Sequence, residues 1–210
     1  RLNGEKREMT MLFSDLAGFT AFTEKLEVES VHKIINSYLS AMTHVIHQYD
    51  GTVVDFMGDG IMAFWGAPVK DELHALHATE AALEMQNKLR ELEKELSQYG
   101  AGKLSMRVGI NTGNVIVGNM GSDERFAYTA LGDATNLASR LEGVNKYYGT
   151  GIIVSDTSAV YVKDHIRLRY VDLVKVKGKE KAVFIFTPCE DQELASLTEE
   201  AFTAYKNQQW

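Results

Sequence analysis

The stretch Met9-Thr-Met-Leu-Phe-Ser-Asp-Leu-Ala-Gly-Phe19 decides how the first part of the chain folds. Its apolar centre predicts a buried strand that delivers one carboxylate, Asp15, into a turn of small residues. The same pattern returns further along, where a strand expected over residues 52–57 runs into Gly58-Asp59-Gly60. Two strands that each end in an aspartate beside glycine indicate that two carboxylates meet at one edge of a sheet.

The two aspartates have two interpretations. Each Asp-Gly alone is a turn signal, and a plain hairpin at Gly58-Asp59-Gly60 explains the second one without any chemistry. Taken together, they favour a site for metal and phosphate, because Mg²⁺ is held by one or two carboxylates and keeps its other positions for water and phosphates. The glycines let backbone N–H groups approach an anion closely.

Composition narrows the class of protein. The 210 residues are 45% hydrophobic with only two prolines, which indicates one globular domain, or one domain with a small extension. A net charge of −7 argues against general affinity for nucleic acid or anionic membranes. The single Cys189 fits a reducing compartment, so we expect a cytoplasmic catalytic domain. The first residue is Arg1, which suggests a fragment and leaves open an upstream sensor or membrane segment.

Apolar periodicity predicts alternating helices and strands. An amphipathic helix is expected between Val31 and Tyr49, and a second long helix opens at Pro68 and Asp71 and ends at Gly100. The remaining expected elements are strands 61–65, 104–111, 114–118, 126–130, 152–154, 166–175 and 182–187, a helix from Asp133, a short helix near 156–162, and a tail helix from about 190 with weak tertiary support. Thr112-Gly113 is read as the turn of a second hairpin. The fold class is α/β or α+β, with one layer of sheet covered by helices.

Other polar residues have both a chemical and a plain explanation. Asn136 and Arg140 are four apart on the helix from Asp133, so they share a face. A guanidinium beside an amide suits a phosphoryl group that gains charge, although the spacing alone is better explained by an ordinary polar flank. Arg107 lies inside an apolar strand, where arginine usually reaches out to solvent.

The lysine and histidine patterns are better explained by a solvated surface. The alternating lysines near the end of a strand are typical of an edge that discourages aggregation, although one of them could reach a polyphosphate. Two pairs of histidines lie three apart on helices, but neither has a well-placed third ligand. These residues are Lys175, Lys177, Lys179 and Lys181, with His44, His47, His74 and His77.

Four ordered motifs carry a family resemblance. Phe13-Ser-Asp-Leu-Ala-Gly-Phe-Thr20, Gly58-Asp-Gly-Ile-Met-Ala-Phe-Trp-Gly66, Arg107-Val-Gly-Ile-Asn-Thr-Gly113 and Tyr128-Thr-Ala-Leu-Gly-Asp-Ala-Thr-Asn-Leu-Ala-Ser-Arg140 resemble, in order and spacing, the motifs of class III nucleotidyl cyclase catalytic domains. The resemblance runs from about residue 5 to 188. It implies a twisted, mostly antiparallel sheet flanked by helices, ferredoxin-like and related to the palm of polymerases. It also implies a head-to-tail homodimer whose active sites lie between the subunits.

The resemblance assigns roles to residues on the metal side of the site. Asp15 and Asp59, with the backbone of Leu16, resemble the ligands of two Mg²⁺ or Mn²⁺ ions per active site. Arg107 resembles the arginine that contacts the phosphates of the nucleotide. Lys177, in Val176-Lys-Gly178, resembles a triphosphate-binding lysine, and the turn through Gly18, Phe19 and Thr20 would offer backbone amides to the phosphates.

The other subunit would supply Asn136 and Arg140. Asn136 and Arg140 resemble the ribose-orienting residue and the residue that stabilises the transition state. Asp55 and Thr129 occupy the positions that read the base. Adenylate cyclases usually carry lysine at the first position and guanylate cyclases glutamate, so Asp55 departs from both, while Thr129 is typical of bacterial adenylate cyclases and tolerates either purine.

The resulting hypothesis is an adenylate cyclase that converts ATP into 3′,5′-cyclic AMP and pyrophosphate. Residues 1–188 would form the catalytic domain and residues 189–210 a helical extension. The alternatives are a guanylate cyclase acting on GTP and a silent, cyclase-like regulatory dimerisation module. A diguanylate cyclase is disfavoured because its Gly-Gly-Asp/Glu-Glu-Phe turn is absent from the sequence.

Overall fold

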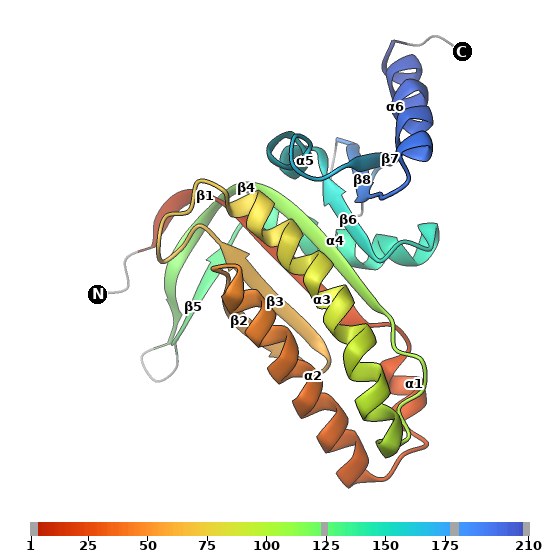
Figure 1. The fold of residues 1–210 in the computed structure, drawn as a ribbon. Helices are drawn as coiled ribbons and strands as arrows, with labels where there is room; N and C mark the ends of the chain where they lie inside the picture. Colours follow the sequence, from red (N-terminus) through yellow and green to blue (C-terminus); the bar gives the residue numbers. More distant parts are fainter. Residues whose placement is uncertain (1–3, 123–125, 177–180, 208–210) are drawn as a thin grey trace.

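A computed structural model describes residues 4–122, 126–176 and 181–207 (Figure 1). Its strands are β1 (Glu5–Leu16), β2 (Thr52–Met57), β3 (Gly60–Trp65), β4 (Met106–Gly121), β5 (Phe126–Leu131), β6 (Ile152–Ser155), β7 (Leu168–Val174) and β8 (Val183–Pro188). Its helices are α1 (Phe19–Thr23), α2 (Val28–Gln48), α3 (His74–Leu96), α4 (Asp133–Tyr148), α5 (Asp156–Val162) and α6 (Gln192–Lys206), with a 3₁₀ turn at Ser97–Tyr99. None of the helices in these ranges is long and apolar enough to cross a membrane.

The strands form one sheet in the order β2-β3-β1-β4-β6-β8-β7, and β5 pairs with β4 beside this path. Every pairing is antiparallel except that of β4 with β6. The prediction of a mostly antiparallel sheet flanked by helices is therefore confirmed. The long strand β4 runs across the molecule and links the region of β5 to that of β6 (Figure 1).

Helices cover both faces of the sheet. On one face, α2 and α3 lie side by side over the sheet (Figure 1) and bury the largest core cluster, which includes Tyr38, Trp65 and Met85. On the other face, a second cluster joins β1 and β4 to α4, where Ala138 packs beside Met11 and Val115. Because burying apolar surface is the main favourable term in folding, these two clusters fix both helix layers on the sheet.

The expected hairpin at Thr112-Gly113 is wrong, because β4 continues through these residues as one strand. The buried hydroxyl of Thr112 forms hydrogen bonds with Thr10 Oγ1 at 2.7 Å and Ser158 Oγ at 2.8 Å. A Cβ at Gly113 would lie 2.8 Å from the Cβ of Ala134. Glycine here makes room for a helix and does not form a turn.

The second long helix also starts later than expected. Helix α3 begins at His74, whereas Pro68 and Asp71 belong to the preceding loop. The carboxylate of Asp71 accepts a hydrogen bond from the Leu73 amide at 2.8 Å, as in a local Asx turn. Leu73, expected on the inner stripe, is 51% exposed.

Helix α6 was expected to have weak tertiary support. It fully buries only Ala195. Its Phe202 ring nevertheless packs against β7 and β8, with ring centroids 4.7 Å from Tyr170, 4.9 Å from Phe184 and 5.5 Å from Phe186. Phe202 therefore gives this helix an aromatic contact with both strands.

Candidate active site

Two central strands place a carboxylate and a guanidinium opposite each other. In the pairing of β1 with β4, Asp15 is the direct partner of Arg107. The Arg107 side chain donates from Nε to Asp15 Oδ1 at 3.1 Å and from Nη2 to Asp15 Oδ2 at 3.0 Å. Such a two-pronged ion pair fixes both side chains in one plane.

The second aspartate reaches the same place from the β2–β3 turn. Gly58, with a φ of 66°, turns the chain just before Asp59. The backbone amide of Leu16 donates to Asp59 Oδ2 at 2.8 Å. Asp59 is therefore bonded to the residue that follows Asp15, and the two carboxylates lie at one end of the sheet, as the sequence indicates.

Tyr38 of α2 lies beneath these carboxylates. Its side chain is fully buried, and its hydroxyl donates to Met106 Sδ at 3.5 Å. Burial raises the pKa of the Tyr38 hydroxyl above its usual value, and the negative charges of Asp59 and Asp15 raise it further, although the nearby Ser14 side chain acts the other way. The floor of the site is thus a neutral hydroxyl.

Glu142 of α4 is a third carboxylate at this place, and the sequence analysis missed it. Its Oε1 lies 3.2 Å from Arg107 Nε, and its side chain is 16% exposed. Burial raises the pKa of Glu142 to about 8, and the neighbouring carboxylates of Asp15 and Asp59 raise it further. The charge of Arg107 opposes this rise but does not overcome it, because the guanidinium is already neutralised by Asp15.

The close approach of α4 to β4 explains why Glu142 is there. A Cβ at Gly109 of β4 would lie 2.2 Å from the backbone nitrogen of Glu142 and 2.4 Å from the carbonyl oxygen of Ala138. The buried Asn145 side chain donates to the carbonyl oxygen of Val108 at 2.9 Å and accepts from Thr150 Oγ1 at 2.8 Å. Glycine on the strand and asparagine on the helix therefore hold the helix backbone directly against the strand.

The residues present fit a divalent cation. Because its raised pKa keeps Glu142 largely neutral near pH 7, the cluster has two charged carboxylates, Asp15 and Asp59, beside the single guanidinium of Arg107, and a cation would neutralise this surplus negative charge. Within residues 4–122, 126–176 and 181–207, no group of three or more histidine, cysteine, aspartate or glutamate side chains is placed to hold a metal ion. Two carboxylates are sufficient for Mg²⁺ when nucleotide phosphates supply the other ligands.

Asn136 and Arg140 do not join this cluster. Both lie on α4, but no hydrogen bond or ion pair links either of them to Asp15, Asp59 or Arg107 in the described part of the chain. Asn136 is exposed. Arg140 Nη1 is buried without a hydrogen-bond partner among the described residues. On α4, Glu142 therefore lies at the cluster, whereas Asn136 and Arg140 lie outside it.

One of the two candidate base-reading residues, Thr129, lies away from the aspartates. Thr129 of β5 pairs with Gly118 of β4, whereas Arg107 lies near the other end of that strand. In Figure 1, β5 and α1, which follows Asp15, lie at opposite ends of β4. Asp55 is exposed on β2, and strands β2 and β5 contact each other.

The remaining candidates lie in the turn after β1 and outside the described residues. Gly18 has a φ of 73° and precedes Phe19 and Thr20, which begin α1. The turn 16–20 therefore starts at the residue whose amide binds Asp59. Lys177 lies outside the described residues.

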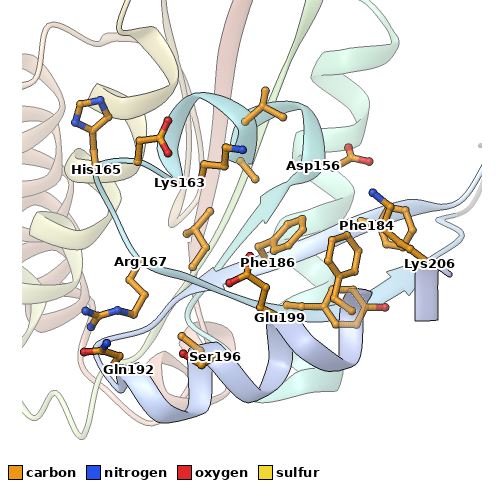
Figure 2. A pocket seen from close by; sticks show the side chains of 17 residues that line it. Asp156, Lys163, His165, Arg167, Phe184, Phe186, Gln192, Ser196, Glu199 and Lys206 are labelled. Carbon is orange, nitrogen blue, oxygen red and sulfur yellow. The ribbon is translucent and has the colours of Figure 1, made fainter. Parts of the chain in front are cut away.

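A large groove lies elsewhere on the molecule. It has a volume of about 930 Å³ and lies between α5, β7, β8 and α6. Figure 2 shows Lys163, Arg167, Phe186 and Glu199 around it. None of the candidate site residues lines this groove, so its size gives no support for a catalytic role.

The fold is that of nucleotidyl cyclase catalytic domains. Residues 3–187 match the family model of the adenylate and guanylate cyclase catalytic domain. The chain therefore belongs to this family, the class III nucleotidyl cyclases.

Particular relatives include cyclases named for both nucleotides. The chain is 37% identical over 181 residues to Adenylate cyclase 1 of Rhizobium meliloti, and 34% identical over 184 residues to an adenylate cyclase of Anabaena cylindrica. Each match covers 86% of this chain, but only 27% and 36% of those proteins. Among solved structures, the adenylyl cyclase CyaB from P. aeruginosa is similar with a TM-score of 0.85 and 34% identity, and the guanylyl cyclase Cya2 with a TM-score of 0.80 and 38% identity. Both structural matches cover 92% of this chain and 99% of the other.

Proposed function

We propose that the chain is an adenylate cyclase catalytic domain that converts ATP into 3′,5′-cyclic AMP and pyrophosphate. The observation that carries this proposal is the meeting of Asp15 and Asp59 through the Leu16 amide, with Arg107 bound to Asp15. Family membership supplies the reaction class. In this proposal residues 1–188 form the catalytic domain and residues 189–210 a helical extension.

In the proposed reaction, the ribose 3′-oxygen bonds to the α-phosphorus while the bond to the β-phosphate oxygen breaks. The 3′-hydroxyl proton is lost and pyrophosphate leaves. Two Mg²⁺ or Mn²⁺ ions, held by Asp15, Asp59 and the backbone of Leu16, would lower the pKa of that hydroxyl and offset the charge of the leaving group. Such catalysis consists mainly of positioning and charge stabilisation, so it requires no nucleophilic side chain.

The protein groups have separate tasks in this proposal. Arg107 leaves Asp15 to bind the phosphates, and the amides of Gly18, Phe19 and Thr20 face the same anion. Lys177 adds a further cation at the triphosphate. Asn136 orients the ribose, and Arg140 stabilises the charge that develops on the α-phosphoryl group.

We infer that two chains form a head-to-tail homodimer to complete each site. Asn136 and Arg140 lie outside the aspartate cluster of their own chain, so a second copy has to supply them. Large apolar side chains are exposed on β2, β4 and β5, as expected for a self-associating surface. They are Phe56, Met57, Ile116, Phe126 and Leu131.

Mixing two inactive variants tests the shared site. An Asp59→Ala chain and an Arg140→Ala chain are each expected to be inactive, whereas mixed dimers contain one intact site and regain activity. Analytical ultracentrifugation establishes that mixed dimers form. If they form without any gain in activity, each site belongs to a single chain and the homodimer proposal fails.

The choice of ATP over GTP is supported by the names of the two bacterial relatives and by the hydroxyl at Thr129. A guanylate cyclase is the second candidate, because Asp55 could accept hydrogen bonds from guanine and the chain is 38% identical to the guanylyl cyclase Cya2. The deciding assay compares kcat/KM for ATP and GTP with Mg²⁺ and with Mn²⁺. A higher value for GTP reverses the assignment, and no cyclic product from either nucleotide favours the regulatory module.

The proposed role of Asp59 in binding a metal ion can be tested by itself. Asp59→Asn keeps the size of the side chain and its acceptor for the Leu16 amide, but removes the charge. We expect at least about a hundredfold loss of turnover, since the ion's stabilisation of the transition state amounts to several kcal/mol. Activity unchanged in Asp59→Asn would show that this carboxylate holds no catalytic ion.

A further inference from the structure

The contact between Glu142 and Arg107 has no part in the family resemblance and involves a residue with no assigned role. Glu142 Oε1 lies 3.2 Å from Arg107 Nε, yet it has no aligned hydrogen bond from any donor in the described part of the chain. The reason is that the Nε hydrogen is directed at Asp15 Oδ1, 3.1 Å away. Glu142 therefore lies next to the guanidinium as a second acceptor that is not yet used.

We propose that Glu142 is a positioning residue that takes over the Nε edge of Arg107 when Asp15 turns to a metal-bound nucleotide. The inference rests on the proposed cyclase function. In the structure, Asp15 accepts both the Nε and the Nη2 hydrogen bonds of Arg107. A cation at the Asp15 carboxylate competes with Arg107 for the carboxylate oxygens, so a second acidic partner helps Arg107 to keep its orientation.

Glu142 can keep Arg107 in place because its own backbone is fixed. The contact of α4 with Gly109 and the bond from Asn145 to the Val108 carbonyl hold the helix against the strand that carries Arg107. Both residues of the pair therefore stand on the same packed unit of α4 and β4. Supporting groups on rigid elements hold a site more accurately than groups on loops do.

The bond at Nε also determines which edge of the guanidinium remains available. With Nε bound to Glu142, the Nη groups are free to form the parallel bonds that arginine makes with phosphate. Without Glu142, the side chain loses its only other acidic neighbour within ion-pair distance among the described residues and samples several rotamers. The expected effect is weaker binding of the nucleotide, and a rise in KM larger than any fall in kcat.

A double-mutant cycle with a non-reactive ligand separates this role from a purely structural one. The probe is the Mg²⁺ complex of 2′,3′-dideoxyadenosine triphosphate, which lacks the attacking hydroxyl, and binding is measured by calorimetry. Glu142→Gln in the natural chain keeps an acceptor oxygen but loses the charge-assisted bond to Nε, so binding should weaken about tenfold, the size of one charged hydrogen bond. In an Arg107→Gln background the same change should cost less than about twofold, because the effect passes through Arg107.

Controls keep the result interpretable. Glu95→Gln makes the same chemical change at an exposed position of α3 and should leave binding unchanged. Thermal unfolding should show that Glu142→Gln is folded. Glu142→Asp keeps the charge but shortens the reach, so it should also weaken binding. The proposal is wrong if Glu142→Gln weakens nucleotide binding equally in the natural chain and in the Arg107→Gln background, or if it does not weaken binding in the natural chain.

A nucleotide-free measurement separates this proposal from the proposed function. The ¹⁵N NMR signal of the Arg107 Nε–H group should move in Glu142→Gln and stay in place in Glu95→Gln, because only Glu142 lies beside that nitrogen. A natural chain that binds no nucleotide refutes the cyclase function, while this signal still tests the contact. An unchanged Arg107 signal in Glu142→Gln refutes the role of Glu142 whatever the nucleotide does.

Discussion

Replacing Gly109 with alanine should loosen the contact on which the candidate site depends. The new Cβ would lie 2.2 Å from Glu142 N, 2.4 Å from Ala138 O and 2.7 Å from Leu141 C, all of them backbone atoms of α4. Ordinary contact begins near 3.4 Å, so the helix has to retreat by about 1 Å. A helix backbone cannot rotate away as a side chain does.

The cost follows from this clash. Overpacking usually destabilises a protein by about 1–3 kcal/mol, and backbone neighbours place Gly109→Ala at the upper end, near 3 kcal/mol. For a chain of this size such a loss lowers Tm by roughly 6–12 °C. Retreat of α4 also moves Glu142 away from Arg107, so nucleotide affinity should fall as well.

The control substitution lies on α4, the helix that packs against Gly109. Gly143 of α4 has no atom within 4 Å of its added Cβ, so Gly143→Ala should raise stability by about 0.5–1 kcal/mol through helix propensity. The assay is thermal and urea unfolding of both variants beside the natural chain. Gly109→Ala with a Tm within about 2 °C of the natural chain would refute the close contact of α4 with β4.

Three further predictions concern other parts of the molecule. Burial lowers the pKa of the His74 imidazole below its usual value of 6.5, although the negative charges of Glu8 and Asp71 act in the opposite direction. As the pH falls, the unfolded chain therefore binds a proton at this histidine before the folded chain does. The stability that neutral His74 contributes is full above pH 6.5 and is lost as the pH falls through the folded pKa. The free energy of unfolding, measured in urea, should fall between pH 7.5 and 5, and it should fall less in His74→Gln. An equal dependence on pH in the two proteins would contradict this role of His74. Phe202→Ala should lower the free energy of unfolding, measured in urea, by roughly 2 kcal/mol. Leu197 is 56% exposed, so Leu197→Ala should lower it by much less. Equal effects would mean that α6 is not anchored by its aromatic ring. Asp55→Lys should raise the ratio of kcat/KM for ATP over GTP by about tenfold, the size of one charged hydrogen bond, and an unchanged ratio would show that position 55 does not read the base.

The sequence predicts the elements of this fold better than it predicts the contacts between them. The strand before Asp15 and the turn at Asp59 are local patterns, so their convergence can be expected from two strand ends. Thr112-Gly113 resembles a turn locally, but Gly113 is needed for the approach of Ala134, a residue distant in sequence. A glycine that makes room for a helix cannot be distinguished from a turn glycine without the tertiary structure.

The candidate site shows the same limit. Glu142 follows the buried Leu141 on a helix, and its spacing gives no sign that it faces Arg107. That position depends on how closely α4 approaches Gly109, which is a property of packing. An acidic residue at the border of a helix's apolar stripe was the only available signal, and such residues are usually solvated.

The unbroken strand β4 also limits which length changes the domain can accept. It carries Arg107 near one end and pairs through Gly118 with Thr129 near the other, a contour of about 36 Å at the usual rise per residue. Inserting or deleting a single residue between these points would reverse the facing of every side chain beyond it. Engineers who attach a new input module should therefore graft it at the ends of the fold and leave this strand at its natural length.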